Sequence, residues 1–362
     1  MADTAIEWAS KVWNPVVGCS LQSPGCTNCY AMRMAWRLQN MAARPDGTGN
    51  PAMNHYEGTV QQSKGGPVWT GLVNVAPDDV FLSPMRRKKP TDYFVNSMSD
   101  LFHPAVPVDV IDRVFAVMAL AQQHIFKVLT KRSDRMRDYW ADRATRERII
   151  RTAEAIRPAT AWSADVWQAT TNLALNVPLP NIWLGVSVED QRRWDERVED
   201  LENTPAAVRF VSIEPLLGPI KTNLVPRFIA DSIAPMTPEI VNAIHGQVQR
   251  PFEIRSMTVH YLDWVIVGGE SGPDARPMHP DWARALRDQC AAAGVPFLFK
   301  QWGEWLPIGQ EDAAVFPLNR AQPFRDEHRF ENGEITQRVG KKVAGRLLDG
   351  VEHNGMLEVR HG

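Results

Sequence analysis

Several features are scarce in this chain of 362 residues, and each scarcity argues against a class of protein. The net charge is only −2, so no overall charge draws the chain to nucleic acid or to a membrane surface, and any such surface must be a local patch. No apolar run reaches about 18 residues, the length that a membrane-spanning helix needs. Residues 1–7 lack the basic and apolar segments of a secretory signal. We therefore expect a cytoplasmic protein with no membrane partner.

Cysteine is also scarce, because the chain has four and three of them fall in one short loop. Cys19, Cys26 and Cys29 are spaced C-x6-C-x2-C, and Cys290 lies far along the chain. An odd cluster cannot pair internally as disulfides, and this cysteine usage suits a reducing compartment. Thiolates are soft ligands that suit zinc or an iron–sulfur cluster. Three thiolates on a [4Fe–4S] cluster would leave its fourth iron open to a small molecule.

Two other interpretations of the cysteines stay open beside the cluster. A structural zinc ion could use the three thiols with a histidine or Cys290, although no second C-x2-C or H-x3-H pair stands nearby and His55 is isolated. The thiols could also bind no metal at all. Tyr30, directly after Cys29, favours the cluster because an aromatic side chain there would exclude water. We expect Cys290, inside an amphipathic helix, to be a buried inert thiol rather than a hydrogen-atom donor.

Strands alternate with helices along most of the chain. The predicted strands are 12–17, 93–96, 126–129, 182–188, 208–213, 264–267 and 297–299, and the predicted helices are 30–40, 108–123, 133–156, 190–202 and 280–293. Helices of about a dozen residues between strands indicate right-handed βαβ units and a parallel sheet. We expect an α/β fold, a complete or partial (β/α) TIM-like barrel, with a doubly wound open sheet as the alternative.

Three segments depart from this alternation. Residues 158–180 and 221–260 contain several prolines and no clear strand signal, so we expect two insertions between barrel units. Residues 304–362 are charged and contain glycine, which predicts a C-terminal extension packed on a barrel made by residues 1–303. Ser133 precedes a helical pattern and is the expected N-cap of that helix.

Polar residues gather directly after the predicted strands, and the cysteine loop also follows a strand. Barrels carry their chemistry at the C-terminal ends of their strands, so we expect these residues on one rim. A carboxylate there could pair with an ammonium group, and glycine lets a backbone approach a ligand closely. Each position could also hold an ordinary solvated side chain. The expected cofactor contacts are Ser97, Ser99, Asp100, Ser187, Glu189, Glu214, Gly268, Gly269 and Glu270, and the expected catalytic residues are Glu270, Asp100 and Lys131.

The cysteine loop on a βα barrel resembles the radical S-adenosylmethionine superfamily. That superfamily usually shows C-x3-C-x2-C with an aromatic before the last cysteine, whereas here the first gap is six residues and Asn28 stands in that place. More closely, the chain resembles the phage and prophage family described as gp thirty-seven / gp sixty-eight, a domain of unknown function. The matching segments are 13–19, 24–31, 95–102, 129–132, 183–191, 212–218, 267–272, 299–303 and 345–350.

The resemblance implies an enzyme. A [4Fe–4S] cluster on Cys19, Cys26 and Cys29 would bind S-adenosylmethionine, and reduction by a flavodoxin- or ferredoxin-like donor would release a 5′-deoxyadenosyl radical. In the superfamily a Gly-Gly-Glu after an early strand holds the methionine amino group, whereas the Gly-Gly-Glu that ends at Glu270 follows a late strand. The alternative is a non-enzymatic nucleic-acid-binding or phage accessory protein, in which zinc or a cluster only holds the N-terminal loop together.

Basic residues form two local groups. Arg86 and Arg87 begin a run of four cations, and Lys131 and Arg132 stand at the expected rim. Two cations at a catalytic rim would suit an anionic substrate such as a nucleotide or a nucleic-acid phosphate. With the phage context that the resemblance implies, this predicts modification or repair of nucleic acid or of a nucleotide. A peptide or a small metabolite is the other possible substrate.

Overall fold

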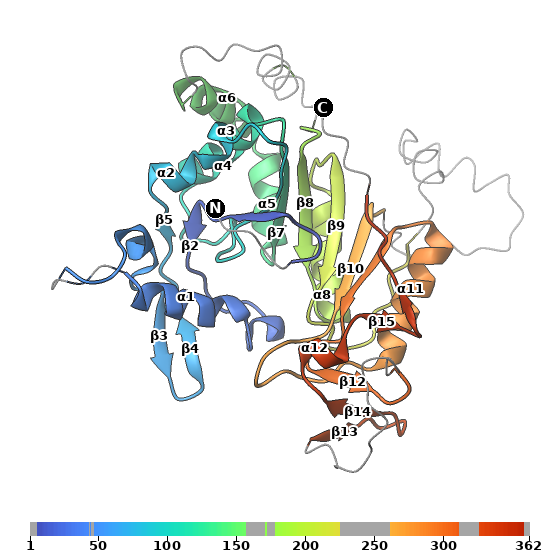
Figure 1. Ribbon diagram of the computed structural model, residues 1–362. Helices are drawn as coiled ribbons and strands as arrows, with labels where there is room; N and C mark the ends of the chain where they lie inside the picture. Colours follow the sequence, from blue (N-terminus) through green and yellow to red (C-terminus); the bar gives the residue numbers. More distant parts are fainter. Residues whose placement is uncertain are drawn as a thin grey trace, which may run out of the picture.

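Seven parallel strands form the main sheet of the computed structural model, which describes residues 6–42, 44, 47–156, 171, 178–224, 261–310 and 326–357. Neighbouring strands follow one another in the sequence, and the sheet is a half-barrel (Figure 1). A doubly wound sheet reverses its strand order, so that alternative is wrong. Within the described residues β1 and β11 do not pair, so the barrel is not closed. The strands are β1 (Lys11–Trp13), β6 (Asp92–Val95), β7 (Ile125–Thr130), β8 (Ile182–Ser187), β9 (Val208–Ile213), β10 (Trp264–Gly268) and β11 (Phe297–Gln301).

Helices cover the outer face of the half-barrel (Figure 1). Crossovers between parallel neighbours are right-handed as a rule, and this places the connecting helices on the same side of a sheet. Strand residues alternate between the two faces, so Val265 and Val267 of β10 join the large outer core while Trp264 and Ile266 face the concave side. The helices are α4 (Val108–Leu120), α5 (Ser133–Ala141), α6 (Thr145–Ile156), α8 (Gln191–Glu202) and α11 (Pro280–Ala293).

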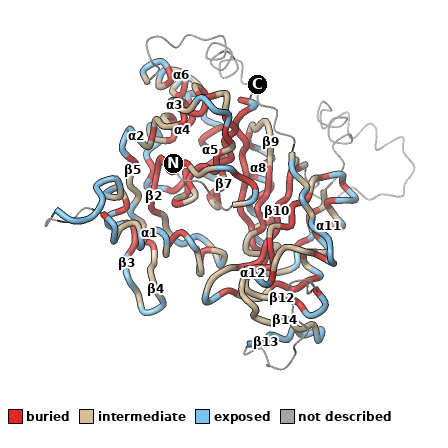
Figure 2. Tube along the Cα trace, viewed as in Figure 1, coloured by how far each residue is buried: buried red, intermediate tan, exposed pale blue. Residues whose placement is uncertain are grey.

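The concave side of the half-barrel is filled by its own apolar cluster, and Figure 2 shows the strands as largely buried. Trp8, from the segment before β1, packs against Phe94 with ring centroids 4.6 Å apart. Lys127 is buried beneath it, and its Nζ donates to the Trp8 carbonyl at 2.6 Å and to Asp92 at 2.7 Å. The concave cluster thus fills the barrel interior below the rim, with the paired Lys127 ammonium enclosed among its aromatic side chains. Its buried members are Trp8, Ala9, Phe94, Ile125, Trp183, Phe210, Trp264, Ile266 and Leu298.

A long excursion separates β1 from β6 and contains the cysteine loop. The predicted strand 12–17 is two strands, because the chain turns at Asn14 and Pro15 and the second half pairs antiparallel with β5 in another sheet. Proline has no N–H to donate, which ends the pairing of β1. The elements of the excursion are β2 (Val16–Val17), η1 (Pro24–Cys26), α1 (Tyr30–Asn40), η2 (Pro51–Tyr56), β3 (Val60–Ser63), β4 (Gly66–Trp69), β5 (Asn74–Val75), α2 (Asp78–Phe81) and α3 (Ser83–Arg86).

The predicted helix 133–156 is two helices, α5 and α6. The backbone of Asp142 is extended, and its Oδ1 accepts from the Ala144 N–H at 3.0 Å, which forms a turn between them. The prediction of Ser133 as N-cap is also wrong, because Arg132 occupies the cap position and Ser133 Oγ donates to Asp200 at 2.7 Å. Helix α4 ends at Leu120, three residues before its predicted end.

The described part of the C-terminal segment packs along β11. Asn354 forms an antiparallel bridge with Leu298, Phe299 N–H donates to the His353 carbonyl at 3.0 Å, and Gly355 N–H donates to the Phe297 carbonyl at 3.0 Å. The outer edge of the last barrel strand is therefore covered, which removes a template for pairing with another chain. The elements here are β12 (Trp305–Pro307), β13 (Glu327–Arg329), β14 (Ile335–Arg338), α12 (Lys341–Ala344), β15 (Leu347–Leu348) and β16 (Val351–Glu352).

The two predicted insertions fall mostly outside the described residues, which include only 171 and 178–180 of the first and 221–224 of the second. Their proposed place between barrel units stays a prediction. Among the helices in the described ranges, none has the length and apolar character that crossing a bilayer requires.

Asp349 attaches the C-terminal segment to α11, and we expect its charge to contribute to stability. Its carboxylate lies 2.8 Å from Arg284 Nη2 and 2.7 Å from Arg287 Nη1, and accepts from Gln310 at 2.9 Å. The hydrogen bond from Arg284, with those from Arg287 and Gln310, holds the pKa of Asp349 well below its usual value. A depressed carboxyl pKa stabilises the fold above the unfolded pKa, about 3.9, and the contribution is lost as the pH falls from there toward the folded pKa.

Asp349→Asn should therefore lower the free energy of unfolding by about 1–2 kcal/mol at neutral pH, and the difference should shrink below about pH 4. Asp349 has a positive φ of 54°, which asparagine also tolerates, so the change isolates the charge. Urea unfolding from pH 7 to pH 3 measures it. Asp288→Asn, at a 67% exposed partner of Arg287, is the control and should change stability by less than about 0.5 kcal/mol. A difference that is constant across this pH range would contradict the ionic explanation.

Candidate functional site

The cysteine loop lies across the C-terminal rim of the half-barrel and is bonded to the ends of several strands. Gly18 bridges to Ser99 after β6, and Ser99 Oγ donates to the Gly18 carbonyl at 2.6 Å. Further along the loop, Ser20, Gly25 and Asn28 reach residues that follow β7, β8 and β10. The sequence prediction that the loop and the polar residues share one rim therefore agrees with the contacts in the structure.

The first attachment joins Cys19 and Ser20 to the ends of β6 and β7. Arg132 Nη1 lies 2.9 Å from Asp100 Oδ2 and 3.8 Å from Cys19 Sγ, while Nη2 donates to Ser20 Oγ at 2.8 Å and to the Ser20 carbonyl at 3.2 Å. Asp100 also accepts from the Thr130 hydroxyl at 2.7 Å and from the Lys131 N–H at 3.0 Å. Both carboxylate oxygens of Asp100 are thus committed within the chain.

The second attachment lies at the end of β8, where Glu189 is completely buried. Its carboxylate lies 3.2 Å from both Lys131 Nζ and Arg197 Nη1 and accepts from the Gly25 N–H at 3.3 Å. Lys131 also donates to Ser187 Oγ at 2.8 Å. Burial alone would raise the pKa of Glu189, but Lys131 and Arg197 hold it below its usual value. A Cβ on Gly25 would lie 3.1 Å from both the carboxylate and Lys131 Nζ, so only glycine fits here comfortably.

The third attachment lies after β10 and centres on Glu270. Arg276 donates to it from the backbone N–H and Nε, both at 2.8 Å, and from Nη2 at 2.6 Å, and Asn28 Nδ2 donates at 3.1 Å. Arg276 Nη2 also donates to the Pro24 carbonyl at 3.0 Å, and Asn28 Nδ2 donates to the Asp274 carbonyl at 2.7 Å. The cation beside Glu270 is therefore a residue of the chain itself.

Within the part of the chain that the structure describes, one acid–base pair on the rim forms no hydrogen bond or ion pair with the cysteine loop. Glu214, after β9, lies 3.0 Å from Lys300 Nζ of β11 and accepts from Ser212 Oγ at 3.0 Å. Both charged side chains are 15% exposed, in contrast to the buried carboxylates of Asp100, Glu189 and Glu270. Gly268 stands between them on β10, and a Cβ there would lie 2.8 Å from Glu214 Oε1.

Two further residues of the predicted set are explained by packing or by local hydrogen bonds. Gly269 has no room for a side chain, because a Cβ would lie 1.9 Å from the Trp302 carbonyl oxygen. Ser97 Oγ donates to Asn14 Oδ1 at 3.1 Å, and the Ser97 carbonyl accepts from the Tyr30 hydroxyl at 3.0 Å. The Tyr30 side chain is 54% exposed beside Cys29, so the expectation that it excludes water from the thiols stays a prediction.

The three loop cysteines are free thiols and near neighbours. Burial, with repulsion from Asp100 and from Cys29, raises the pKa of Cys19 to about 12, and burial followed by repulsion from Cys26 also raises the pKa of Cys29. Over the described residues, no three His, Cys, Asp or Glu side chains converge in a way that could hold one metal ion. Cys290 is completely buried in the outer core, and burial raises its pKa to about 12, which fits the expected inert thiol.

The four predicted nucleic-acid contacts all have partners within the chain. Lys131 and Arg132 belong to the attachments of the cysteine loop described above. Arg86 donates to the Asp79 carbonyl, and Arg87 Nε donates to Thr91 Oγ1 at 2.6 Å. Thr91 directly precedes β6, so Arg87 lies at the N-terminal end of the sheet, opposite the rim. The two basic groups therefore do not form one surface.

Sequence reasoning missed two polar residues that complete the rim, and it gave no role to a third. Arg276 and Lys300 supply the cations for Glu270 and Glu214, and Asn14 Oδ1 accepts from Ser97 and from the Met98 N–H at 3.2 Å. Lys300 falls at the end of a predicted strand and was expected on the rim for that reason, but it was not assigned to the site. Arg276 lies in an irregular segment, where no helix or strand periodicity indicates which way its side chain points.

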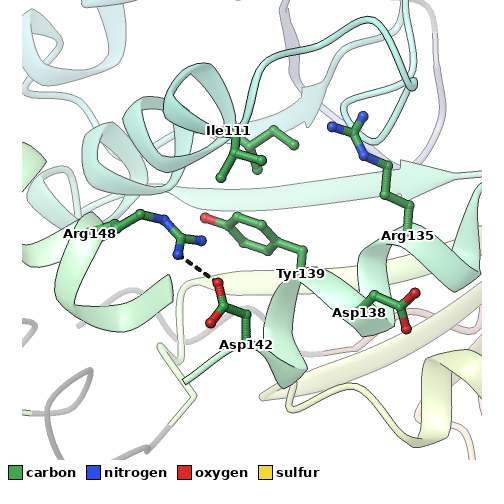
Figure 3. A pocket seen from close by; sticks show the side chains of 7 residues that line it. Ile111, Arg135, Asp138, Tyr139, Asp142 and Arg148 are labelled. Atoms are coloured by element: carbon green, nitrogen blue, oxygen red, sulfur yellow. Dashed lines mark hydrogen bonds and ion pairs between the residues drawn. The ribbon is translucent and has the colours of Figure 1, made fainter. Parts of the chain in front are cut away.

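A cavity of about 410 Å³ lies outside the half-barrel, among α4, α5 and α6 (Figure 3). Its charged lining residues have partners in the chain: Arg148 bonds to Asp142 at 2.6 Å, and Arg135 donates to the His103 and Val106 carbonyls. Tyr139 OH donates to Asp112 at 2.7 Å. This cavity therefore supplies no group for the chemistry of the rim. Its lining residues are Val108, Ile111, Arg135, Asp138, Tyr139, Asp142 and Arg148.

A family model described as "Protein of unknown function (DUF5131)" matches residues 3–357. No curated protein and no solved structure matches the chain. The family description names neither the phage proteins nor the radical S-adenosylmethionine superfamily, so those two resemblances stay predictions.

Proposed function

Since the chain belongs to the DUF5131 family, whose description assigns no activity, we propose a function from the rim itself: an iron–sulfur enzyme of the radical S-adenosylmethionine type. The observation that carries the proposal is the position of the three thiols. They lie on a loop that crosses the C-terminal rim of a parallel half-barrel and is attached to residues after β7, β8 and β10. In barrels of this kind, reactive groups act from that rim.

The thiols suit a cluster better than a single zinc ion. A zinc ion needs its ligands to converge on one point, and the described residues offer no such convergence. In a [4Fe–4S] cluster each thiolate bonds a different iron, so neighbouring thiols need not meet at one point. The raised pKa values of Cys19 and Cys29 belong to buried thiols without a metal, and thiolate ligands are deprotonated when they bind one.

The chain's own residues divide into two groups in this proposal. Asp100, Glu189 and Glu270, with their cations, hold the loop that carries the thiols. Glu214 and Lys300 are partly exposed and, among the described residues, form no hydrogen bond or ion pair with the loop, so we assign them to ligand contact. The carboxylate would accept hydrogen bonds from ribose hydroxyls, and the ammonium would bind an anionic or carbonyl group. A bound cluster, reduced by the electron donor, would supply the one electron that cleaves S-adenosylmethionine to methionine and the 5′-deoxyadenosyl radical.

The substrate that this rim favours is small and polar. All four cations predicted to contact nucleic acid are bonded within the chain, and Arg87 lies at the opposite end of the sheet from the rim. A polymer would need several uncommitted cations along its phosphates. We therefore propose a small metabolite or a nucleotide as substrate, and an electron donor of the flavodoxin or ferredoxin type as partner.

Reduced, cluster-loaded protein should form 5′-deoxyadenosine from S-adenosylmethionine, slowly even without substrate. Glu214→Gln should weaken S-adenosylmethionine binding by roughly tenfold, because a hydrogen bond to a charged group is worth about 1.5–3 kcal/mol. The readouts are product formation by chromatography and the change in the electron paramagnetic resonance signal as S-adenosylmethionine is titrated.

Glu199→Gln is the matched control, since Glu199 is exposed on α8 and its carboxylate has no hydrogen-bond or ion-pair partner within the described residues. It should bind S-adenosylmethionine as the wild type does. An intact cluster whose resonance signal does not respond to S-adenosylmethionine would remove the radical chemistry from the proposal. The protein would then use its cluster for structure or for electron transfer alone.

A further inference from the structure

We propose that Arg132 tunes the reduction potential of the cluster by donating a hydrogen bond to the Cys19 sulfur, and that Asp100 limits the size of this effect. The inference rests on the proposed function, because it requires Cys19 to be a cluster ligand. It gives Arg132 a role other than the nucleic-acid contact predicted from the sequence, and Asp100 a role other than contact with a cofactor.

The guanidinium of Arg132 has little freedom to turn elsewhere. Its side chain is 5% exposed, and Nη2 is fixed by two hydrogen bonds to Ser20, the residue after Cys19. On the other side, Nη1 lies 2.9 Å from Asp100 Oδ2 and 3.8 Å from Cys19 Sγ, within hydrogen-bond distance for sulfur. The planar fork of arginine suits such simultaneous contacts, whereas lysine offers a single ammonium group on a flexible stem.

Asp100 is equally fixed, so the three groups form one rigid unit. Its Oδ1 accepts from the Phe102 N–H at 3.0 Å and from the Thr130 hydroxyl, and its Oδ2 accepts from the Lys131 N–H in addition to Arg132. These donors come from the segment after β6 and from the end of β7. The barrel strands therefore set the position of the guanidinium relative to the sulfur.

The electrostatic consequence follows from charge. Adding an electron makes a thiolate-bound cluster more negative, and a buried cation with an N–H directed at a ligand sulfur favours that state. Arg132 therefore raises the reduction potential. The negative charge of Asp100 offsets part of the cation, so Asp100 lowers the potential from what Arg132 alone would set. The two residues act in opposite directions, which a purely structural role would not produce.

The experiment measures the midpoint potential of the reconstituted full-length protein with redox mediators, followed by the resonance signal of the reduced cluster. Arg132→Met should lower the midpoint potential by ~59 mV or more, which for a one-electron couple is a tenfold change in the reduction equilibrium. Asp100→Asn should raise it. Arg143→Met, at an exposed arginine between α5 and α6, is the control for loss of a positive charge and should leave the midpoint unchanged.

Iron content separates the outcomes. If Arg132→Met does not retain iron, the midpoint potential of Arg132→Lys decides. Lysine keeps the positive charge but loses the planar fork, so this midpoint should lie below those of the wild type and of Arg143→Met. If the iron-loaded Arg132 and Asp100 variants have wild-type midpoints, or midpoints that shift in the same direction, this inference is overturned. The proposed function is not affected by that result. A wild-type protein that binds no iron overturns the proposed function, and this inference with it.

Discussion

Replacing any one of Cys19, Cys26 or Cys29 with alanine should abolish cluster binding. Wild-type protein reconstituted without oxygen should contain about four irons per chain and absorb broadly near roughly 400 nm, as thiolate-bound clusters do. The loss should be nearly complete for each variant, because the three thiols come from one loop and no fourth protein thiol is close enough to substitute. Iron analysis, sulfide analysis and the absorption spectrum measure this directly.

Cys290→Ala is the matched control for the cysteine variants. Cys290 is completely buried in α11, on the outer side of the sheet, so its removal should leave the iron content unchanged and cost only modest stability. Stoichiometric zinc in protein purified without oxygen would contradict the cluster and restore the zinc interpretation. Circular dichroism on each variant shows whether lost iron reflects a missing ligand or an unfolded chain.

Gly269→Ala should severely destabilise the protein, by about 3 kcal/mol or more. The added Cβ would lie 1.9 Å from the Trp302 carbonyl oxygen, and a backbone atom cannot move aside as the end of a side chain can. The segment after β11 approaches just as closely in return, because a Cβ on Gly303 would lie 2.0 Å from the Glu270 carbonyl oxygen. The measurement is the free energy of unfolding in urea, together with the yield of soluble protein.

Gly65→Ala is the control, since a Cβ there has no heavy atom within 4 Å and should change stability by less than about 0.5 kcal/mol. Were Gly269→Ala as stable as this control, backbone packing would not be the reason for glycine at that position. A stable Gly269→Ala protein that failed to bind S-adenosylmethionine would instead support the cofactor contact expected from the sequence.

The sequence allowed the parallel sheet and its rim to be predicted because both depend on local patterns. Buried parallel strands are short apolar runs, and the residues directly after them share one end of the sheet. The boundaries were less accurate where a pattern continued across a break. Val16 extends the apolar run of β1 although Pro15 ends its pairing, and the helical periodicity continues past Asp142, whose turn with Ala144 was a readable signal.

Partners on the rim were harder to predict because they depend on distances across the sheet. Asp100 and Arg132 follow neighbouring strands, so their pairing could have been inferred from strand order. Glu214 and Lys300 follow strands separated by β10, and they meet because Gly268 has no side chain between them. Glu270 could have been assigned to an ammonium ligand or to a cation of the chain with equal reason, and only the structure shows Arg276 beside it.

The concave core contains residues from both ends of the described chain, and this affects how the protein must fold. Trp8 packs on Phe94 and Phe210, while Trp264 Nε1 donates to the Gly355 carbonyl at 2.7 Å and Leu357 packs against the same cluster. Trp8 precedes Phe210 by 202 residues and Trp264 precedes Gly355 by 91, and contacts so far apart in sequence give a high contact order, which slows folding. During synthesis, an unfinished chain would therefore expose aromatic side chains and the unpaired edge of β11 until residue 355 has left the ribosome. We expect its refolding yield to fall steeply with protein concentration, because exposed edges and apolar faces aggregate in proportion to how often chains meet.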